Sequence, residues 1–291
     1  MRGDTQWKYV IDSENRRFEL KFREVWQYRD LVLLLVKRDF ASKYKQMRLG
    51  PLWSIINPVI YTVFFTIVFG NLAKLPTMDV PATGNVVVPT FLFYMIGNVL
   101  WSYFSSTVSG ISRVFLQNAP IMGKVYYPRL VSPFATTLFG LIAEAISMIL
   151  FAILLLIFSV QGSAVVHPGP LLLLFPLIII QIMLLGMGVG LIVSAATTKY
   201  RDITMMVDFA LRLGLYVTPV AYGLQFISEK WLPLFMLNPV TPIITTARYL
   251  CFGEGFFQIQ YYLISWFISV LIFLFGVVLF NRAEKNFVDL V

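Results

Sequence analysis

Few residues of this chain have the type and spacing that chemistry requires, and those that do lie within apolar sequence. Asp208, Arg212 and Tyr216 recur every four residues, so on a helix they form one polar stripe in which Asp208 and Arg212 can pair. Glu144 lies in a different apolar stretch and could reach Arg212. Charges inside a membrane are costly and are commonly functional. Two carboxylates on separate helices make neither a proton relay nor a metal site. We therefore expect these three charges either to fix helix packing or to line a lumen.

The sequence offers no catalytic constellation of its own. It contains no phosphate-binding loop of the form G-x-x-x-x-G-K-[ST], so we expect no nucleotide site on this chain. Gly186, Gly188 and Gly190 lie inside an apolar stretch, where such spacing favours close helix packing. One Cys and one His exclude a disulfide framework and a Cys/His metal cluster. We therefore expect no enzymatic activity, no metal and no bound cofactor.

The composition is typical of a membrane protein. Hydrophobic residues make up 58% of the chain and charged residues 13%, whereas soluble proteins carry roughly 45–50% and about 25%. The net charge of +8 could suggest a nucleic-acid partner, but 12 of the 23 basic residues precede residue 52. We expect an all-α polytopic protein that contacts membrane lipids and no nucleic acid, with a basic N-terminal segment (1–50) followed by a transmembrane domain (51–291).

Six apolar stretches are long enough to cross the hydrocarbon core. They are residues 52–72, 88–110, 132–160, 171–196, 204–222 and 260–280. With the N-terminus inside, the inner segments hold 19 Lys and Arg residues and the outer segments hold three. Because basic loops remain in the cytoplasm, we expect both termini to be cytoplasmic.

Three other segments are too apolar for solvated loops. Residues 20–49 carry apolar side chains at helical spacing among charges, which predicts an amphipathic helix at the membrane surface. Loop 111–131 predicts a short helix that docks on a partner or lies along the membrane. Segment 224–259 has apolar runs too short to span and is interrupted by prolines, so we expect a re-entrant hairpin, about 224–248.

Aromatic residues recur on several predicted spans. Such stripes suit the apolar faces of sugar rings, but interfacial belts and lipid-facing bulk produce the same pattern. The aromatic residues that could form a glycan path are Tyr61, Phe65, Phe69, Tyr94, Trp101 and Tyr216.

An ordered set of motifs resembles a known family. The set comprises Arg38-Asp39-Phe40, Leu49-Gly50-Pro51-Leu52-Trp53, Asn57-Pro58, Tyr127-Pro128, Lys199-Tyr200-Arg201-Asp202, Thr218-Pro219-Val220 and Leu237-Asn238-Pro239. Over about residues 30–285 the chain is similar to polysaccharide-exporting ABC transporter permeases, which export lipid-linked O-antigen, capsule or teichoic acid.

The resemblance implies a homodimer in the bacterial inner membrane, with two copies of a separate ATPase that bind ATP and Mg²⁺. The expected cargo is a lipid-linked polysaccharide, most of all O-antigen, moved outward from the cytoplasmic side. The alternatives are an ABC permease for a drug or another lipid, and a membrane-embedded polyprenyl-sugar transferase, for which a catalytic base is lacking.

The resemblance also assigns roles to three groups of residues. The ATPase-coupling group is Arg113, Phe115, Asn118, Ala119, Pro120, Met122, Lys124, Tyr127, Arg201 and Asp202. The cytoplasmic entrance, where cations could attract the pyrophosphate of a lipid carrier, is Arg29, Lys37, Arg38, Lys43, Lys45 and Arg48. The outer gate is Trp231, Phe235, Asn238 and Arg248.

Overall fold

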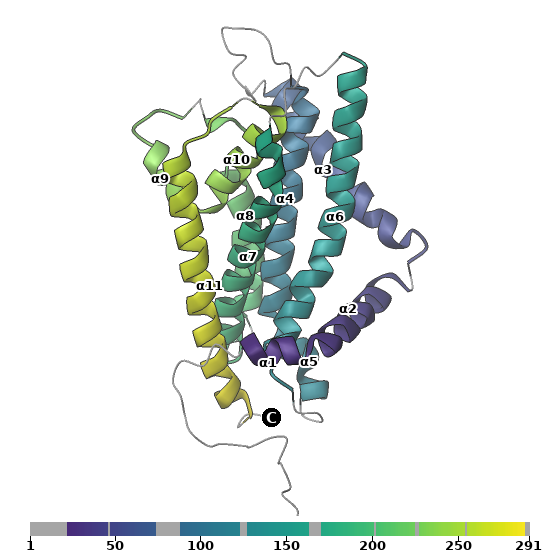
Figure 1. Cartoon of the computed structure of the whole chain (residues 1–291), viewed down its shortest axis with the longest axis vertical. Coiled ribbons are helices and arrows are strands. Elements are labelled where there is room, and N and C mark those ends of the chain that lie inside the picture. Colours follow the sequence, from purple (N-terminus) through teal and green to yellow (C-terminus); the bar gives the residue numbers. More distant parts are fainter. Residues whose placement is uncertain are drawn as a thin grey trace, which may run out of the picture.

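The described part of the chain is a bundle of helices without a strand (Figure 1). The computed structural model describes residues 22–45, 47–73, 88–122, 127–162, 170–200, 202–224, 227–253 and 255–288. The order is α1 (Phe22–Gln27), α2 (Arg29–Tyr44), η1 (Gly50–Leu52), α3 (Trp53–Phe65), η2 (Thr66–Leu72), α4 (Thr90–Ser112), α5 (Val114–Met122), α6 (Val131–Val160), η3 (Pro170–Leu174), α7 (Phe175–Thr197), α8 (Ile203–Val217), α9 (Leu232–Leu237), α10 (Val240–Phe252) and α11 (Ile259–Val288). The all-α expectation is therefore confirmed for these residues.

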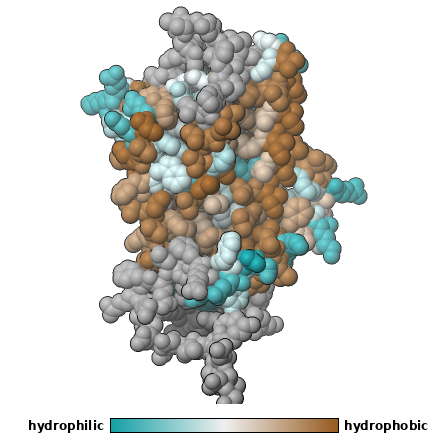
Figure 2. All heavy atoms as spheres, in the orientation of Figure 1, coloured by the Kyte–Doolittle hydropathy of each residue, from teal (hydrophilic) through white to brown (hydrophobic). Residues whose placement is uncertain are grey.

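Within the described ranges, four helices are long and apolar enough to cross a membrane. They are Gly50–Leu72, Val131–Val160, Leu172–Thr197 and Ile259–Ala283. They coincide with four of the six predicted spans. Figure 2 shows apolar side chains over much of the visible middle of the bundle, as expected of a surface that faces lipid.

The two remaining predicted spans differ from the others. Helix α4 has 23 residues but carries many polar side chains, and most of it is buried between its neighbours. Helix α8 has only 15 residues, about 22 Å at 1.5 Å per residue. It ends at Val217 rather than at the predicted residue 222, because Thr218 is extended before Pro219 and residues that precede proline avoid the α conformation.

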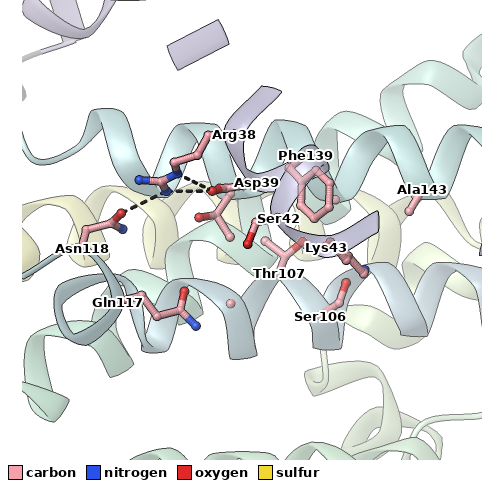
Figure 3. Close-up of a pocket in the computed structure, with 13 residues that line it drawn as sticks. Arg38, Asp39, Ser42, Lys43, Ser106, Thr107, Gln117, Asn118, Phe139 and Ala143 are labelled. Atoms are coloured by element: carbon pink, nitrogen blue, oxygen red, sulfur yellow. Dashed lines mark hydrogen bonds and ion pairs between the residues drawn. The ribbon is translucent and has the colours of Figure 1, made fainter. Parts of the chain in front are cut away.

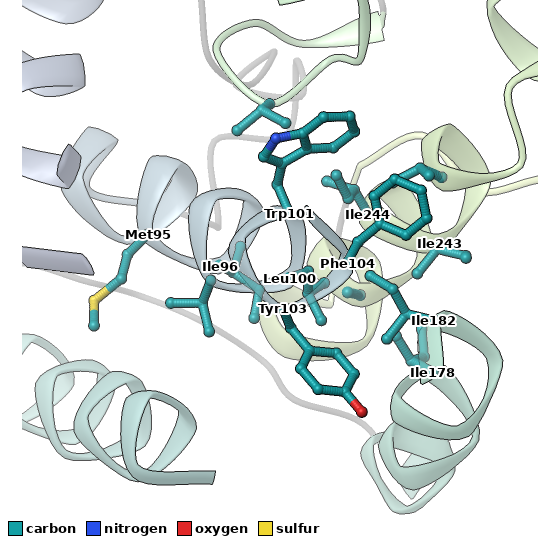
Figure 4. Packing of buried hydrophobic residues seen from close by; sticks show 14 of the residues in the cluster. Met95, Ile96, Leu100, Trp101, Tyr103, Phe104, Ile178, Ile182, Ile243 and Ile244 are labelled. Carbon is teal, nitrogen blue, oxygen red and sulfur yellow. The ribbon is translucent and has the colours of Figure 1, made fainter. Parts of the chain in front are cut away.

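Helix α4 is the centre of the main hydrophobic core. Its side chains Met95, Ile96 and Leu100 are fully buried, and they share this core with Ile182 of α7 and Ile243 of α10 (Figure 4). Burial on several sides explains why α4 needs fewer apolar residues than a lipid-facing helix. Other elements are therefore positioned around α4.

The glycines of α7 allow two neighbouring helices to approach closely. A Cβ at Gly190 would lie 2.8 Å from Ile111 of α4, so the predicted packing role is confirmed. On the opposite side, a Cβ at Gly188 would lie 2.7 Å from the backbone of Phe273, and one at Gly276 would lie 2.5 Å from the carbonyl oxygen of Gly188. Helices α7 and α11 are thus in direct backbone contact.

The short helices lie at opposite ends of the bundle (Figure 1). Helices α1, α2 and α5 lie at the end where α11 finishes, which we call the α5 end. A second core cluster joins them there, with Val32 and Leu35 of α2 near Phe115 of α5 and Phe280 of α11. Helices α9 and α10 lie at the other end, the α10 end. The segment 20–49 is helical as predicted, in α1 and α2, but α2 is not amphipathic: Val32 and Leu35 are buried, and Leu33 and Leu34 are exposed beside charged residues on the other face.

Candidate functional site

Arg248 holds the broken end of α8 at the α10 end. Its side chain is 4% exposed, and its Nη1 and Nη2 donate to the carbonyl oxygens of Pro219 and Val220, each at 2.7 Å. The guanidinium also lies over the ring of Phe93, 3.6 Å from the centroid. Backbone carbonyls that leave a helix inside apolar surroundings need a donor. Arg248 supplies two in fork geometry and so makes the non-helical turn tolerable.

A second polar group fastens the same turn to α10 and α11. Asn238 Nδ2 donates to Thr218 Oγ1 at 2.9 Å, and Asn238 Oδ1 accepts from the Val240 N–H at 3.1 Å. Ser265 of α11 donates to the Pro239 carbonyl at 2.7 Å and accepts from Gln181 at 2.8 Å. Predicted gate residues Asn238 and Arg248 are therefore brought together around the end of α8.

The other two predicted gate residues, Trp231 and Phe235, are not part of the hydrogen-bonded group around Arg248. Trp231 is exposed, and Phe235 meets Tyr222 edge-on with centroids 6.3 Å apart. Sequence reasoning named Thr218 only as part of a motif and gave it no role, and it missed Gln181 and Gly97; a Cβ at Gly97 would lie 2.8 Å from Arg248 Nη2. The Thr-Pro and Asn-Pro pairs mark the turn in the sequence, but nothing in the spacing indicates the partner of either.

The charges that the sequence predicted within the membrane are paired differently from the prediction. Asp208 accepts a hydrogen bond from Ser109 at 2.6 Å and forms an ion pair with Arg113, at the end of α4. The predicted Asp208–Arg212 pair is wrong, because α8 packs beside the end of α4 and presents Asp208 to it, while Arg212 is exposed. This contact connects α8 directly to the residue that precedes α5.

Glu144 is buried on α6, away from the other two charges. Its Oε1 has no hydrogen-bond partner among the described residues, and its neighbour Ser147 donates to the carbonyl of Ser54 on α3 at 3.0 Å. Within the described ranges no contact with Arg212 is found. Glu144 is therefore buried in the packing between helices of the described part of the chain.

A cavity of about 580 Å³ with both polar and apolar lining residues lies at the α5 end, between α2, α4, α5 and α6 (Figure 3). Arg38 Nε and Nη2 donate to Asp39 Oδ1 at 2.9 and 2.7 Å, and Nη2 also donates to Asn118 Oδ1 at 3.1 Å. Lys43 lies near two rings, with Nζ 5.5 Å from the centroid of Tyr44 and 5.3 Å from that of Phe139. Two predicted entrance cations and one predicted coupling residue thus line one cavity, a grouping that the sequence did not indicate.

The remaining predicted entrance cations are Arg29, Lys37, Lys45 and Arg48, all of which are exposed. Arg29 lies 6.0 Å from the ring of Trp26. These four do not converge on one point of the described structure. They form a basic surface along and after α2 rather than a site.

The predicted coupling residues lie on and around α5. The ring of Phe115 stacks on that of Phe280 at 4.6 Å, and the hydroxyl of Tyr127 lies 3.1 Å from that of Ser132, so both aromatic side chains anchor the loop to the bundle. Asp202 is exposed. Lys124 and Arg201 lie outside the described residues, as do the side chains of Ala119, Pro120 and Met122.

The predicted aromatic path divides into buried and exposed members. Phe65 contacts Phe69 and Tyr94, with centroids 5.1 and 6.1 Å apart, and Trp101 contacts Phe104 at 5.4 Å. Phe65, Tyr94 and Trp101 are buried in the core, whereas Tyr61 and Tyr216 are 56% and 53% exposed. Only the two exposed tyrosines present most of their surface outside the subunit.

Comparison with known proteins gives one family and three curated relatives. The model of the ABC-2 type transporter family matches residues 30–252. Two relatives from Klebsiella pneumoniae, each named O-antigen export system permease protein RfbA, are 24% identical over 90% of this chain and 95% of their own length. A relative of the same name from Myxococcus xanthus is 26% identical over 78% of this chain and 82% of its own.

Proposed function

The chain belongs to the ABC-2 type transporter family, and from this premise we propose that it is the membrane subunit of an ATP-driven exporter of lipid-linked polysaccharide, O-antigen in particular. The observation that carries the proposal is the similarity to O-antigen export permeases over nearly the whole chain. The helical bundle, with four helices able to cross a membrane among those described, supports it. A separate subunit of the same exporter binds ATP and Mg²⁺ and hydrolyses the nucleotide.

The full subunit would cross the bacterial inner membrane six times with both termini in the cytoplasm. The α5 end is then cytoplasmic, in agreement with the excess of Lys and Arg there. Helix α4 and the short helix α8 supply the two further crossings. Helices α9 and α10, which follow α8, form a re-entrant hairpin in the outer leaflet. Two copies of the chain and two ATPase subunits form the exporter.

Movement of the ATPase reaches the spans through α5 in this proposal. Helix α5 docks on the ATPase, and Arg113, just before it, holds Asp208 of α8. A displacement of α5 therefore changes the position of α8, and with it the turn at Thr218 that Arg248 and Asn238 fasten to α10. The inner and outer ends of the path are in this way mechanically connected within one chain.

Deletion of the gene followed by complementation tests the proposed function. Cells without the protein should lose surface polysaccharide and accumulate the lipid-linked glycan on the inner face of the membrane. Affinity purification of the restored protein should co-purify an ATPase in equal amount. A chain that purifies alone and modifies a lipid-linked sugar would instead show a transferase, and the proposal would be wrong.

A charge at Ala119, in α5, should separate ATPase docking from folding. We expect Ala119→Glu to reduce co-purification of the ATPase about tenfold or more, because a carboxylate in a docking surface must be desolvated. The thermal unfolding temperature of the isolated permease should stay unchanged. Ser228→Glu, at the opposite end of the bundle, is the matched control, and normal complex assembly by the Ala119 variant would contradict the docking role.

The exposed tyrosines test the glycan path. We expect Tyr61→Ala combined with Tyr216→Ala to slow export several-fold without lowering the unfolding temperature, because ring stacking with sugars is lost while the core is intact. Phe65→Ala is the contrasting variant, since its ring is buried, and it should reduce stability by about 3–5 kcal/mol. Unchanged export by the double variant would mean that both tyrosines face lipid.

A further inference from the structure

Two buried polar groups near the α10 end have no hydrogen-bond partner among the described residues. One is the hydroxyl of Tyr94 on α4, whose side chain is 0% exposed. The other is Nε of Arg248 on α10, the guanidinium nitrogen that the bonds to the carbonyls of Pro219 and Val220 leave unused. Because nearly all buried polar groups in folded proteins are paired, each of these two calls for an explanation.

The two groups are chemically complementary and lie in the same part of the core. A tyrosine hydroxyl can accept the hydrogen bond that an Nε–H donates. Neighbours of Tyr94 along α4 contact Arg248 directly: the ring centroid of Phe93 lies 3.6 Å from its Cζ, and a Cβ at Gly97 would lie 2.8 Å from its Nη2. The charge of Arg248 also acts electrostatically on the Tyr94 hydroxyl. A donor and an acceptor without partners are thus neighbours that are not bonded to each other.

Helix α3 and the segment after it hold the ring of Tyr94 in its present position. The ring meets Phe65 of α3 edge-on, with centroids 6.1 Å apart, and a Cβ at Gly70 of η2 would lie 3.7 Å from Tyr94 Cε2. Phe65 in turn contacts Phe69 of η2, with centroids 5.1 Å apart. The direction of the Tyr94 hydroxyl therefore depends on where α3 and η2 lie.

The η2 segment is a π-helix, which makes its position adjustable. The Ala73 N–H donates to the carbonyl oxygen of Val68, five residues earlier, rather than four as in an α-helix. Such turns are rare and occur frequently at functional sites. None of the seven described residues of η2 is buried, so few core contacts oppose a shift of this segment. A change of one π turn to an α turn would displace η2 relative to the Tyr94 ring.

We propose that Tyr94 is a positioning residue for the turn after α8, and that its hydroxyl accepts a hydrogen bond from Arg248 Nε in a second state of the transport cycle. When η2 and α3 shift, the Tyr94 ring turns with them and its hydroxyl meets Nε. The other two guanidinium nitrogens keep the carbonyls of Pro219 and Val220. The bond fastens α3 to the turn in that state alone. This inference rests on the proposed function, since it requires a transport cycle driven by the ATPase.

Replacement of Tyr94 by Phe removes the hydroxyl and keeps the ring. We expect Tyr94→Phe to leave the thermal unfolding temperature of the purified permease unchanged or to raise it, because the hydroxyl is buried without a partner. Export should fall about tenfold, because a hydrogen bond to a charged group is among the stronger ones and only the second state loses it. Tyr103→Phe is the matched control on α4: its hydroxyl donates to the Thr137 carbonyl oxygen at 3.4 Å, so its removal should lower the unfolding temperature.

Infrared difference spectroscopy of the complex of permease and ATPase detects the bond itself. The C–O stretching band of one tyrosine should differ between the complex with and without a non-hydrolysable ATP analogue, because this frequency depends on the hydrogen bonds of the phenol oxygen. Ring-deuterated tyrosine assigns the band. The difference should be absent from Tyr94→Phe and from Arg248→Lys, which has no Nε, and present in Tyr103→Phe.

Each outcome of these measurements bears on the role of Tyr94. A band difference that persists in Tyr94→Phe, or its absence from an unmodified complex that exports polysaccharide, would overturn the assignment while the proposed function stands. Unimpaired export by Tyr94→Phe would do the same. If Tyr94→Phe lowered the unfolding temperature as much as Tyr103→Phe, the hydroxyl would already be paired and the inference would be wrong. Absence of an ATPase partner would instead overturn the proposed function and this inference together.

Discussion

Replacing Arg248 by Met should lower the free energy of unfolding by about 3 kcal/mol or more. The substitution removes both hydrogen bonds from the guanidinium and leaves the carbonyl oxygens of Pro219 and Val220 buried without a donor. A hydrogen bond to a charged group contributes about 1.5–3 kcal/mol, and each unpaired buried acceptor carries a desolvation penalty of similar size. We expect the turn at Thr218–Val220 to lose its attachment to α10, and export to be lost with it.

The thermal unfolding temperature in detergent and protease accessibility of segment 227–253 measure this effect. Arg248→Lys should have a stability between that of the unmodified protein and that of Arg248→Met, since an ammonium cannot form the planar fork to both carbonyls. Lys230→Met, which removes an exposed cation from the same segment, is the matched control. Equal stability of Arg248→Met and Lys230→Met would contradict the assignment.

Reversing either charge of the Arg113–Asp208 pair should reduce export about tenfold or more while the ATPase remains bound. The two side chains are 40% and 29% exposed, so solvent screens the pair and its contribution is on the order of 1 kcal/mol. Reversal of one charge replaces this attraction by a repulsion of similar size, and about 1.4 kcal/mol corresponds to a factor of ten. Its loss leaves two like charges facing each other between the end of α4 and α8. The position of α8 then no longer follows α5.

The exchange of both charges supplies the internal control. Arg113→Asp and Asp208→Arg together restore an attractive pair, so export should recover at least in part, as a double-mutant cycle requires of interacting residues. Surface polysaccharide and ATPase co-purification are measured for the four proteins in parallel. If the double variant exports no better than the worse single variant, α5 and α8 are not coupled through this contact.

The sequence predicts the helices of this fold better than it predicts their partners. Length and hydropathy suffice for the four long apolar helices, because lipid imposes the same requirement along their whole length. They are insufficient for α8, since the end of that helix depends on Arg248, which lies 29 residues beyond Pro219. The guanidinium supplies the hydrogen bonds that the carbonyls of Pro219 and Val220 lack outside a helix, and a hydropathy profile cannot detect a donor so far away in the sequence.

Helical spacing likewise identifies a face without identifying its neighbour. The interval of four between Asp208 and Arg212 is correct for a pair within one helix, yet Asp208 pairs with Arg113 on another. The aromatic stripe of Tyr61 and Phe65 also divides, since one residue is exposed and the other is buried. Periodicity describes one helix at a time, whereas both outcomes depend on which second helix lies beside it.

The backbone contact between α7 and α11 limits how the subunit can move. Where Gly188 and Gly276 meet, the two backbones touch with no side chain between them whose rotamers could absorb sliding or rotation, and the hydrogen bond from Gln181 to Ser265 joins the same two helices. They should therefore behave as one rigid body throughout a transport cycle. The displacement that opens a path has to occur along other contacts of the subunit. The short helix α8 is fastened to the end of α4 through Asp208, and the turn that follows it is fastened to Arg248 and Asn238, so α8 is the element that can tilt between these two attachments.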